Sequence, residues 1–264
     1  MFVGISKTRS DSEDGIYIKI VQEAFNSYKL FKNFKRNIDY MTVLEHVSES
    51  QGMLYLDTIR NESPELLNVI ESYKENDIVG NPMVYKYEGV GKISPTTLRY
   101  IKVSSDLKRF FGLHIGDRIV EIGGGYGGQA LINDKTFCIK VYEILDLYPV
   151  LKLISKYLEC HILKSSYKVS TLNQKSGEEK YDLVISNYAF SELPKNLQLE
   201  YIRKVLSKSR KGYLTMNSGR SNETSRSTGK MTLDQLKKEL QPFEIFEETP
   251  LTGPDNYLIV WGHN

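Results

Sequence analysis

From about residue 117 to the C-terminus, the chain alternates short apolar runs with amphipathic stretches of helical period. DRIVEIG, KVYEILD, KYDLVISNY and KGYLTMNS are predicted strands, and PVLKLISKYL and PKNLQLEYIRKVL are among the helices predicted between them. A helix between two strands returns the chain to the same edge of the sheet, so consecutive strands lie parallel. The alternation therefore predicts an α/β fold built from βαβ units.

The C-terminal end breaks this alternation. MTLDQLKKEL is a predicted helix in which Thr232 and Gln235 have the spacing of a capping box. FEIFEETP and YLIVWG are two predicted strands, and the Gly- and Pro-containing connection LTGPDN indicates that they close the sheet as an antiparallel hairpin. The polar run NSGRSNETSRSTGK before that helix is predicted to be a mobile loop.

Residues 1–112 are predicted to form a mostly helical cap, and residues 113–264 the core. Apolar residues recur at three- and four-residue steps in IYIKIVQEAFNSYKLFKNF and YMTVLEHV. PELLNVIESYKEND is a further predicted helix, with Ser63 as N-cap and Pro64 at its first position. DIVGNPMVYKYEGVGKISP predicts a connecting loop with a hairpin, and PTTLRYIKVSSDLKRFFG a last helix that ends at Gly112.

The cluster EIGGGYGG lies between a predicted strand and a predicted helix. Glycines there permit a sharp turn and close approach of a ligand, and free amides at the helix start favour an anionic or polar group. The cluster fits two patterns, the dinucleotide GxGxxG and the acid-first ExGxGxG, the latter through Glu121, Gly123, Gly125 and Gly127. The glycines alone do not decide between these two patterns.

Two acids favour S-adenosylmethionine over NAD. Glu121 stands where dinucleotide folds usually carry an apolar residue, and a carboxylate there suits a cationic amino group. Asp146 ends the next predicted strand and is placed to accept hydrogen bonds from ribose hydroxyls, a role that fits either cofactor. Both acids together, followed by the terminal hairpin, indicate S-adenosylmethionine. A turn that binds no ligand is the remaining alternative.

Several strings carry a resemblance to a known family: NDIVGNP, ISPTTLRY, IVEIGGGYGGQA, DLYPVLKLISKYL, YDLVISNYAFSEL, GYLTMNSG and TGPDNYLIVWG. On these strings the core resembles class I S-adenosylmethionine-dependent methyltransferases, and the wider pattern resembles the sugar O-methyltransferases of surface-glycan gene sets. The glycine motif is common to a whole superfamily. SNYAFSEL and SPTTLRY are the specific part of the resemblance.

The resemblance implies a Rossmann-like, seven-stranded, mostly parallel sheet whose last strand is antiparallel. The cofactor would lie across the carboxyl ends of the first, second and fourth strands, in agreement with the crevice rule for open α/β sheets. Glu121 and the glycines would line its methionine and ribose portion, and Asp146 would hold the ribose hydroxyls. Asn187 and Tyr188 would follow the fourth strand near the reactive sulfonium.

Methyl transfer to oxygen needs a group that takes a proton from the acceptor hydroxyl. Glu192, a few residues after the fourth predicted strand, is the first candidate, and the alternative is that Ser191 and Glu192 cap the next helix. His46 is the second candidate, because the N-terminal helices would cover the site; the alternative is an ordinary surface or interhelical histidine. His114 and His263 are expected at the opposite edge of the sheet.

Four further residues have two interpretations each. The resemblance makes Arg99 and Tyr100 candidates to contact the cofactor carboxylate or an acceptor phosphate, whereas packing at the helix interface is the alternative. Asp77 and Asn81 are candidates to line the acceptor pocket or are simply turn formers. His161, after a predicted helix, is expected at the surface.

Composition limits the partners. The 35 Lys and Arg residues nearly balance the 33 Asp and Glu residues, and no basic stripe with interleaved aromatics occurs, so no nucleic-acid partner is expected. Cys138 and Cys160 cannot form a disulfide framework, and the sequence has no signal-peptide core or membrane-length apolar run, so a cytoplasmic protein is expected. No cluster of metal ligands is apparent and no metal is expected, although magnesium held by carboxylates stays open, as does the oligomeric state.

The resemblance thus implies an S-adenosylmethionine-dependent O-methyltransferase that acts on a sugar hydroxyl in surface-glycan or capsule assembly. One alternative is the same chemistry on a phosphoryl-type or amine acceptor. A second alternative is a cofactor-binding partner without catalysis, against which the intact glycine motif and both acids argue. Nucleic-acid methylation is disfavoured, because SNYAF stands where amino-methylating enzymes carry a D/N-P-P-aromatic string.

Overall fold

The computed structural model describes residues 15–220 and 229–263. Its centre is a seven-stranded sheet with the order β5-β4-β3-β6-β7-β9-β8. The strands are β3 (Arg118–Ile122), β4 (Val141–Leu145), β5 (Ser166–Ser170), β6 (Tyr181–Asn187), β7 (Ser209–Met216), β8 (Glu244–Glu247) and β9 (Tyr257–Trp261). Neighbours from β5 to β7 pair in parallel, and β9 is antiparallel to both β7 and β8. The predicted Rossmann-like α/β sheet with an antiparallel last strand is confirmed.

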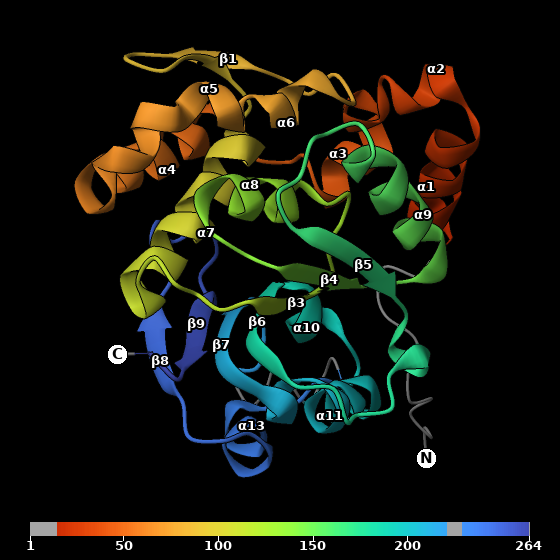
Figure 1. Ribbon diagram of the computed structural model, residues 1–264, viewed down its shortest axis with the longest axis vertical. Helices are drawn as coiled ribbons and strands as arrows, with labels where there is room; N and C mark the ends of the chain where they lie inside the picture. The colour runs from red at the N-terminus through yellow and green to blue at the C-terminus, as the bar shows by residue number, and fades with distance from the viewer. Residues whose placement is uncertain (1–14, 221–228, 264) are drawn as a thin grey trace.

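Helices cover both faces of this sheet. Figure 1 shows α7, α8 and α9 on one face and α10, α11 and α13 on the other. These helices and their short neighbours are α7 (Pro95–Phe111), α8 (Gly128–Thr136), α9 (Tyr148–Leu158), η4 (Leu172–Gln174), α10 (Ala189–Glu192), α11 (Lys195–Lys204), η5 (Leu206–Lys208) and α13 (Leu233–Glu239). Successive residues of β3, Ile119 and Val120, enter the two separate cores, as side chains alternate across a strand. Burial on both faces is why β3 and β6 carry apolar residues at consecutive central positions, Ile119–Val120 and Leu183–Ile185.

The N-terminal residues add a further layer on the face that carries α7 to α9. Its elements are α1 (Ile16–Asn26), α2 (Tyr28–Phe31), η2 (Phe34–Arg36), α3 (Ile38–Val43), α4 (Glu49–Glu62), η3 (Pro64–Val69), α5 (Ile70–Tyr73), α6 (Glu75–Ile78), β1 (Tyr85–Tyr87) and β2 (Gly91–Ile93). In this layer α1 packs on α9 and α4 packs on α7 (Figure 1). Buried residues of the layer belong to the same hydrophobic cluster as those of α7 to α9. The N-terminal layer therefore shares one hydrophobic core with this face of the sheet.

Local signals for turns and caps are mostly confirmed. The hairpin β1–β2 and the terminal hairpin β8–β9 are both antiparallel pairs. The capping box before α13 is present, with the Gln235 amide donating to Thr232 Oγ1 at 3.2 Å and the Thr232 amide donating to Gln235 Oε1 at 3.1 Å. The centre of the predicted mobile loop, residues 221–228, lies outside the described residues.

Two predictions about elements are wrong or incomplete. Ser63 and Pro64 occupy the N-cap and first positions of η3 as predicted, but the Ser63 side chain makes no capping bond and its hydroxyl accepts a hydrogen bond from Ser105 at 2.9 Å instead. The expected single helix after Pro64 is divided into η3, α5 and α6. The competing contact with α7 takes the cap away. Strand β5 is absent from the residue-level prediction because it is an edge strand with mixed burial and polar residues such as Lys168.

His161 is half-buried rather than a plain surface residue. Its ring lies 4.7 Å from the ring of Tyr157, and its buried Nε2 has no hydrogen-bond partner among the described residues. Burial, followed by the charge of Lys35, lowers the pKa of His161 to about 4. Protonation of this imidazole is therefore disfavoured in the folded state.

We expect His161 to make folding sensitive to acid. Its folded pKa is below its ordinary value of 6.5, so its contribution to stability is complete above about pH 6.5 and is lost as the pH falls toward about 4. A His161→Phe variant keeps a ring against Tyr157 without a titrating nitrogen, and should unfold at a lower pH than wild type in circular dichroism. His114→Gln, at an exposed site, is the control. Equal acid midpoints for His161→Phe and wild type would contradict this expectation.

Candidate functional site

A cavity of about 590 Å³ opens at the carboxyl ends of β3, β4 and β6. Its volume is within the range of ligand pockets, and its position is the crevice where open α/β sheets bind ligands. Residues between α3 and α4 and the start of α4 form its other wall. Most of the predicted site residues line it, whereas Gly127, Asp77 and Asn81 do not. The lining residues among them are His46, Arg99, Tyr100, Glu121, Gly123, Gly125, Asp146, Asn187, Tyr188 and Glu192.

The glycine loop between β3 and α8 is shaped by close packing. Gly123 has a φ of 76°, and a Cβ there would lie 2.1 Å from the Cβ of Ala189, so only glycine fits. Gly127 has a φ of 97° and precedes the first residue of α8, where it packs against Leu158 instead of facing the cavity. The structure thus places Gly123 at the cavity wall and Gly127 in the turn behind it.

Asp146 lies just beyond β4, with its carboxyl group in the cavity wall. Its Oδ1 accepts a hydrogen bond from the Leu147 amide at 2.7 Å, and the amides of Gly125 and Gly124 lie near enough to stabilise the ionised carboxyl group. Burial nevertheless raises the pKa of Asp146 to about 7, because these three amides offset only part of the desolvation. Hydrogen-bond donors of a bound ligand would favour the ionised form of the Asp146 carboxyl group.

Glu121, near the end of β3, is only 2% exposed. The Tyr142 hydroxyl donates a hydrogen bond to its Oε2 at 2.9 Å. Burial raises the pKa of Glu121 to about 8; the Tyr142 bond opposes this shift and the Asp146 charge adds to it. Two carboxyl groups that share one cavity are relieved by a bound cation or by ligand hydroxyls.

Arg99 and Tyr100, on α7, have different surroundings. The Arg99 guanidinium donates one hydrogen bond, to the Leu44 carbonyl at 3.3 Å, and no carboxylate lies within 4 Å of it among the described residues. Since arginine keeps its charge and has five N–H donors, it is suited to an anionic ligand group. Tyr100 packs edge-on against Tyr126 with ring centroids 6.0 Å apart, so packing accounts for the position of the Tyr100 ring.

Tyr188 follows β6 in an unusual backbone conformation. Its φ of 66° is rare for a residue with a side chain and indicates a strained turn at the cavity. The Tyr188 hydroxyl donates to Glu248, a buried carboxylate that also accepts from Thr252 Oγ1 at 2.7 Å and from Asn256 Nδ2 at 2.9 Å. The loop after β8 therefore holds the tyrosine in place.

Glu192 closes the short helix α10. Asn217 Nδ2 donates to its Oε1 at 2.9 Å, whereas its Oε2 has no hydrogen bond within the described residues. The alternative that Ser191 and Glu192 cap the next helix is wrong: α11 starts after Pro194, without a side-chain cap. The Ser191 hydroxyl instead has two possible acceptors, Asn217 Oδ1 and the Tyr188 carbonyl, each 2.7 Å away, and its single hydrogen donates to one of them at a time.

His46 lies beyond the end of α3, on the wall opposite the sheet, and is not in a helix. It is exposed to solvent. Partial desolvation at the cavity wall, followed by the charge of Arg99, lowers the pKa of His46 below its ordinary value of 6.5. Its imidazole is therefore neutral at pH 7 and able to accept a proton.

Asp77 and Asn81 do not line the cavity, so their candidacy for the acceptor pocket is wrong. Asp77 accepts hydrogen bonds from the Ser94 amide at 2.7 Å and from the Thr97 hydroxyl, and so braces the first turn of α7. Asn81 has a φ of 54° and is a turn former. His114 and His263 also lie outside the cavity.

Several cavity residues were not predicted: Tyr17, Gln51, Tyr55, Asn173, Asn217, Thr252 and Asn256. They come from segments far apart in the sequence, and none belongs to a motif with its own signal. Asn217, Thr252 and Asn256 had one indirect signal, because all three lie inside strings that carry the family resemblance.

Within residues 15–220 and 229–263, no group of three or more His, Cys, Asp or Glu side chains is placed to hold a metal ion. None of the helices there has the length and apolar character to cross a bilayer.

No protein-family model and no curated protein matches the chain. Among solved structures, it is similar to a geranyl diphosphate methyltransferase in complex with GPP and sinefungin, with a TM-score of 0.46 and 12% identity over 63% of this chain and 78% of that chain. It is also similar to the mitomycin 7-O-methyltransferase MmcR and the pyocyanin biosynthetic protein PhzM, with TM-scores of 0.43 and identities of 11% and 14% over 62% of this chain. The chain spans 56% of the length of each of these two proteins.

Proposed function

We propose that this protein is an S-adenosylmethionine-dependent O-methyltransferase that acts on a sugar hydroxyl in surface-glycan or capsule assembly. The observation that carries the proposal is the pair of carboxyl groups, the buried Glu121 and the partly buried Asp146, on either side of the glycine loop in one cavity. A dinucleotide would bring two phosphate charges beside these carboxyl groups. A cofactor with a cationic amino-acid end suits them better.

The charged groups of the cavity match the parts of this cofactor. Asp146 would accept hydrogen bonds from the ribose hydroxyls, and Glu121 would lie toward the ammonium group. Arg99 would bind the carboxylate, for which it has unused N–H donors in the cavity wall. The alternative for Arg99 is a phosphate on the acceptor.

When bound, S-adenosylmethionine supplies a methyl group activated by a sulfonium. The protein has to align the acceptor oxygen and receive its proton. We assign the role of proton acceptor first to Glu192. Asn217 holds its Oε1, and its Oε2 is available to take the proton. His46 is the second candidate, because its lowered pKa keeps the imidazole unprotonated at pH 7.

A polyhydroxylated acceptor fits the polar walls of the cavity. Neutral hydrogen-bonding side chains from different segments line it, among them Gln51, Asn217, Thr252 and Asn256. Such groups pair well with hydroxyls, which also donate and accept. The resemblance carried by SNYAFSEL and SPTTLRY supports a sugar, whereas a phosphoryl-type or amine acceptor is the alternative.

Calorimetry with S-adenosylmethionine and S-adenosylhomocysteine tests the cofactor, and binding of neither compound would overturn the proposal. Incubation with labelled methyl donor and a panel of sugar nucleotides, oligosaccharides and amines, followed by mass spectrometry, tests the acceptor. A methylated sugar is the expected product. If the methyl group is transferred only to amines, the proposed sugar acceptor is wrong and an amine takes its place. If the cofactor binds but no acceptor is methylated, a non-catalytic partner is favoured.

A further inference from the structure

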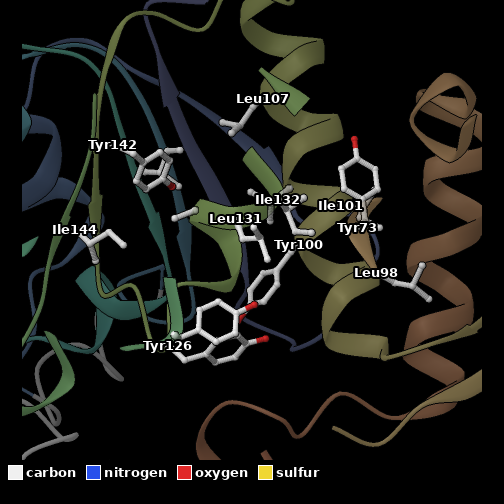
Figure 2. Packing of buried hydrophobic residues seen from close by; sticks show 14 of the residues in the cluster. Tyr73, Leu98, Tyr100, Ile101, Leu107, Tyr126, Leu131, Ile132, Tyr142 and Ile144 are labelled. Carbon is white, nitrogen blue, oxygen red and sulfur yellow. The ribbon is translucent and has the colours of Figure 1, made fainter. Parts of the chain in front are cut away.

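Tyr126 is the one side chain inside the glycine-rich run, and it points away from the cavity. It is 0% exposed and packs edge-on against Phe34, Tyr100 and Tyr157, with ring centroids 5.7, 6.0 and 4.9 Å away. Figure 2 shows the rings of Tyr126 and Tyr100 side by side. The loop is therefore attached from behind to the N-terminal layer and to α7 and α9.

A buried lysine lies over this ring. Lys35, in η2, is 0% exposed, and its Nζ is 4.1 Å from the centroid of Tyr126 and 5.1 Å from that of Tyr157. The ammonium donates one hydrogen bond, to the Asn76 carbonyl at 2.6 Å. No carboxylate lies within 4 Å of it in the part of the chain that the structure describes. A charge in such a place is costly unless the surrounding rings and dipoles hold it.

Asn76 joins the lysine to the rings around it. Its Nδ2 donates to the Tyr126 hydroxyl at 3.1 Å, and its Oδ1 accepts from the Tyr157 hydroxyl at 2.6 Å. The Asn76 carbonyl, bound to Lys35, belongs to the same residue. Lysine, amide and tyrosines therefore form one buried network, and loss of the ammonium would loosen Tyr126 in it.

A peptide bond and an electrostatic contact connect this network with the cavity. Tyr126 follows Gly125, and the amides of Gly125 and Gly124 lie near the Asp146 carboxyl group and stabilise its ionised form. A shift of the Tyr126 ring would move these amides, since glycines offer little resistance to rotation of the backbone. The position of Asp146 thus depends on a contact on the far side of the loop.

We infer that Lys35 is a positioning residue for the cofactor site: its ammonium holds the Tyr126 ring, and this contact keeps the glycine-loop amides on Asp146. The inference rests on the proposed function, because it is the affinity for the cofactor that Lys35 supports. It assigns a role in binding to a residue that does not touch the cavity and lies in a different layer of the molecule.

Cofactor binding should depend on the protonation of Lys35. The groups that face Lys35 are Glu45 beyond α3, Asp77 on α6, Tyr126 in the loop, and Tyr157 with His161 on and after α9. Burial lowers the pKa of Lys35 to about 8, although Glu45 and Asp77 act in the opposite direction. Affinity should therefore fall as the pH rises through about 8 and the ammonium is lost.

The test is a titration with S-adenosylhomocysteine and with 5′-methylthioadenosine, which lacks the titrating amino-acid end, from about pH 6.5 to about pH 9.5. Lys35→Met keeps the apolar stem and removes the charge. We expect it to bind about tenfold more weakly at neutral pH and to lose the fall above about pH 8. Lys32→Met is the matched control, because Lys32 is exposed and lies over the ring of Tyr28 at 4.4 Å.

A folded Lys35→Met protein with the affinity and pH profile of wild type would overturn the inference. If circular dichroism shows that Lys35→Met does not fold, the pH titration of the wild-type protein tests the inference. Unchanged affinity for 5′-methylthioadenosine above about pH 8 then overturns the inference, and a fall supports it. Failure of the wild type to bind S-adenosylhomocysteine at any pH counts against the proposed function instead.

Discussion

Replacement of Asp146 by alanine is expected to weaken binding of S-adenosylhomocysteine about 100-fold. The proposed role of Asp146 is to accept two hydrogen bonds from the ribose, and two such bonds to a charged acceptor contribute about 3 kcal/mol in total. Isothermal titration calorimetry measures the loss. Asp39→Ala, which removes an exposed carboxylate in the first turn of α3, should bind as wild type does.

Asp146 also determines whether the affinity for S-adenosylhomocysteine rises or falls with pH near neutrality. The Asp146 pKa of about 7 means that part of the free protein carries a neutral carboxyl group, which must ionise to accept both ribose bonds. Affinity should therefore rise as the pH increases through about 7, and Asp146→Asn should abolish this rise. An affinity of Asp146→Ala within a few fold of wild type would contradict the assigned role.

Replacement of Glu192 by glutamine is expected to lower the rate of methyl transfer by about 10² to 10⁴. Glutamine retains the shape and can still accept from Asn217, but it cannot take up a proton. The affinity for S-adenosylhomocysteine should stay within about twofold, because the assigned role concerns the acceptor hydroxyl. Single-turnover measurements with saturating cofactor separate the two quantities. Glu200→Gln, on α11 and paired with Lys204, is the control.

His46→Gln provides the competing outcome. If the imidazole takes the proton, this variant should lose the activity and Glu192→Gln should keep most of it. The pH profile then serves as a second readout, because the pKa of His46 is lowered from 6.5 and its activity should persist below that pH. Loss of activity in neither variant would remove both residues from the proposed mechanism.

Much of the fold was predictable because its signals are local. The apolar runs that become β3, β4, β6 and β7 are continuous in sequence, since both faces of the sheet are covered. β5 was missed for the opposite reason: an edge strand has fewer buried positions and keeps polar residues. The capping bond predicted for Ser63 does not form, because a cap signal reflects only the local chain and Ser105 on α7 hydrogen-bonds to the same hydroxyl.

The candidate site was predictable where the topology of the sheet brings its residues together. Glu121, Asp146 and Asn187 each lie at or next to the carboxyl end of a strand, and the ends of adjacent parallel strands meet at one edge. Asp77 was misplaced because its loop packs against the start of α7. Glu248, which holds Tyr188, lies 60 positions further along the chain, and no pattern links the two residues.

The sequence by itself determined the α/β fold, the acid–glycine–acid arrangement and the strand ends that form the crevice, because periodicity and glycine backbone freedom act over a few residues. Only the tertiary structure decided that Arg99 lacks a carboxylate partner among the described residues, that Gly127 turns away from the cavity, and that Lys35 lies on Tyr126. Burial, desolvation and pairing depend on segments that are distant in sequence and meet only in the folded chain.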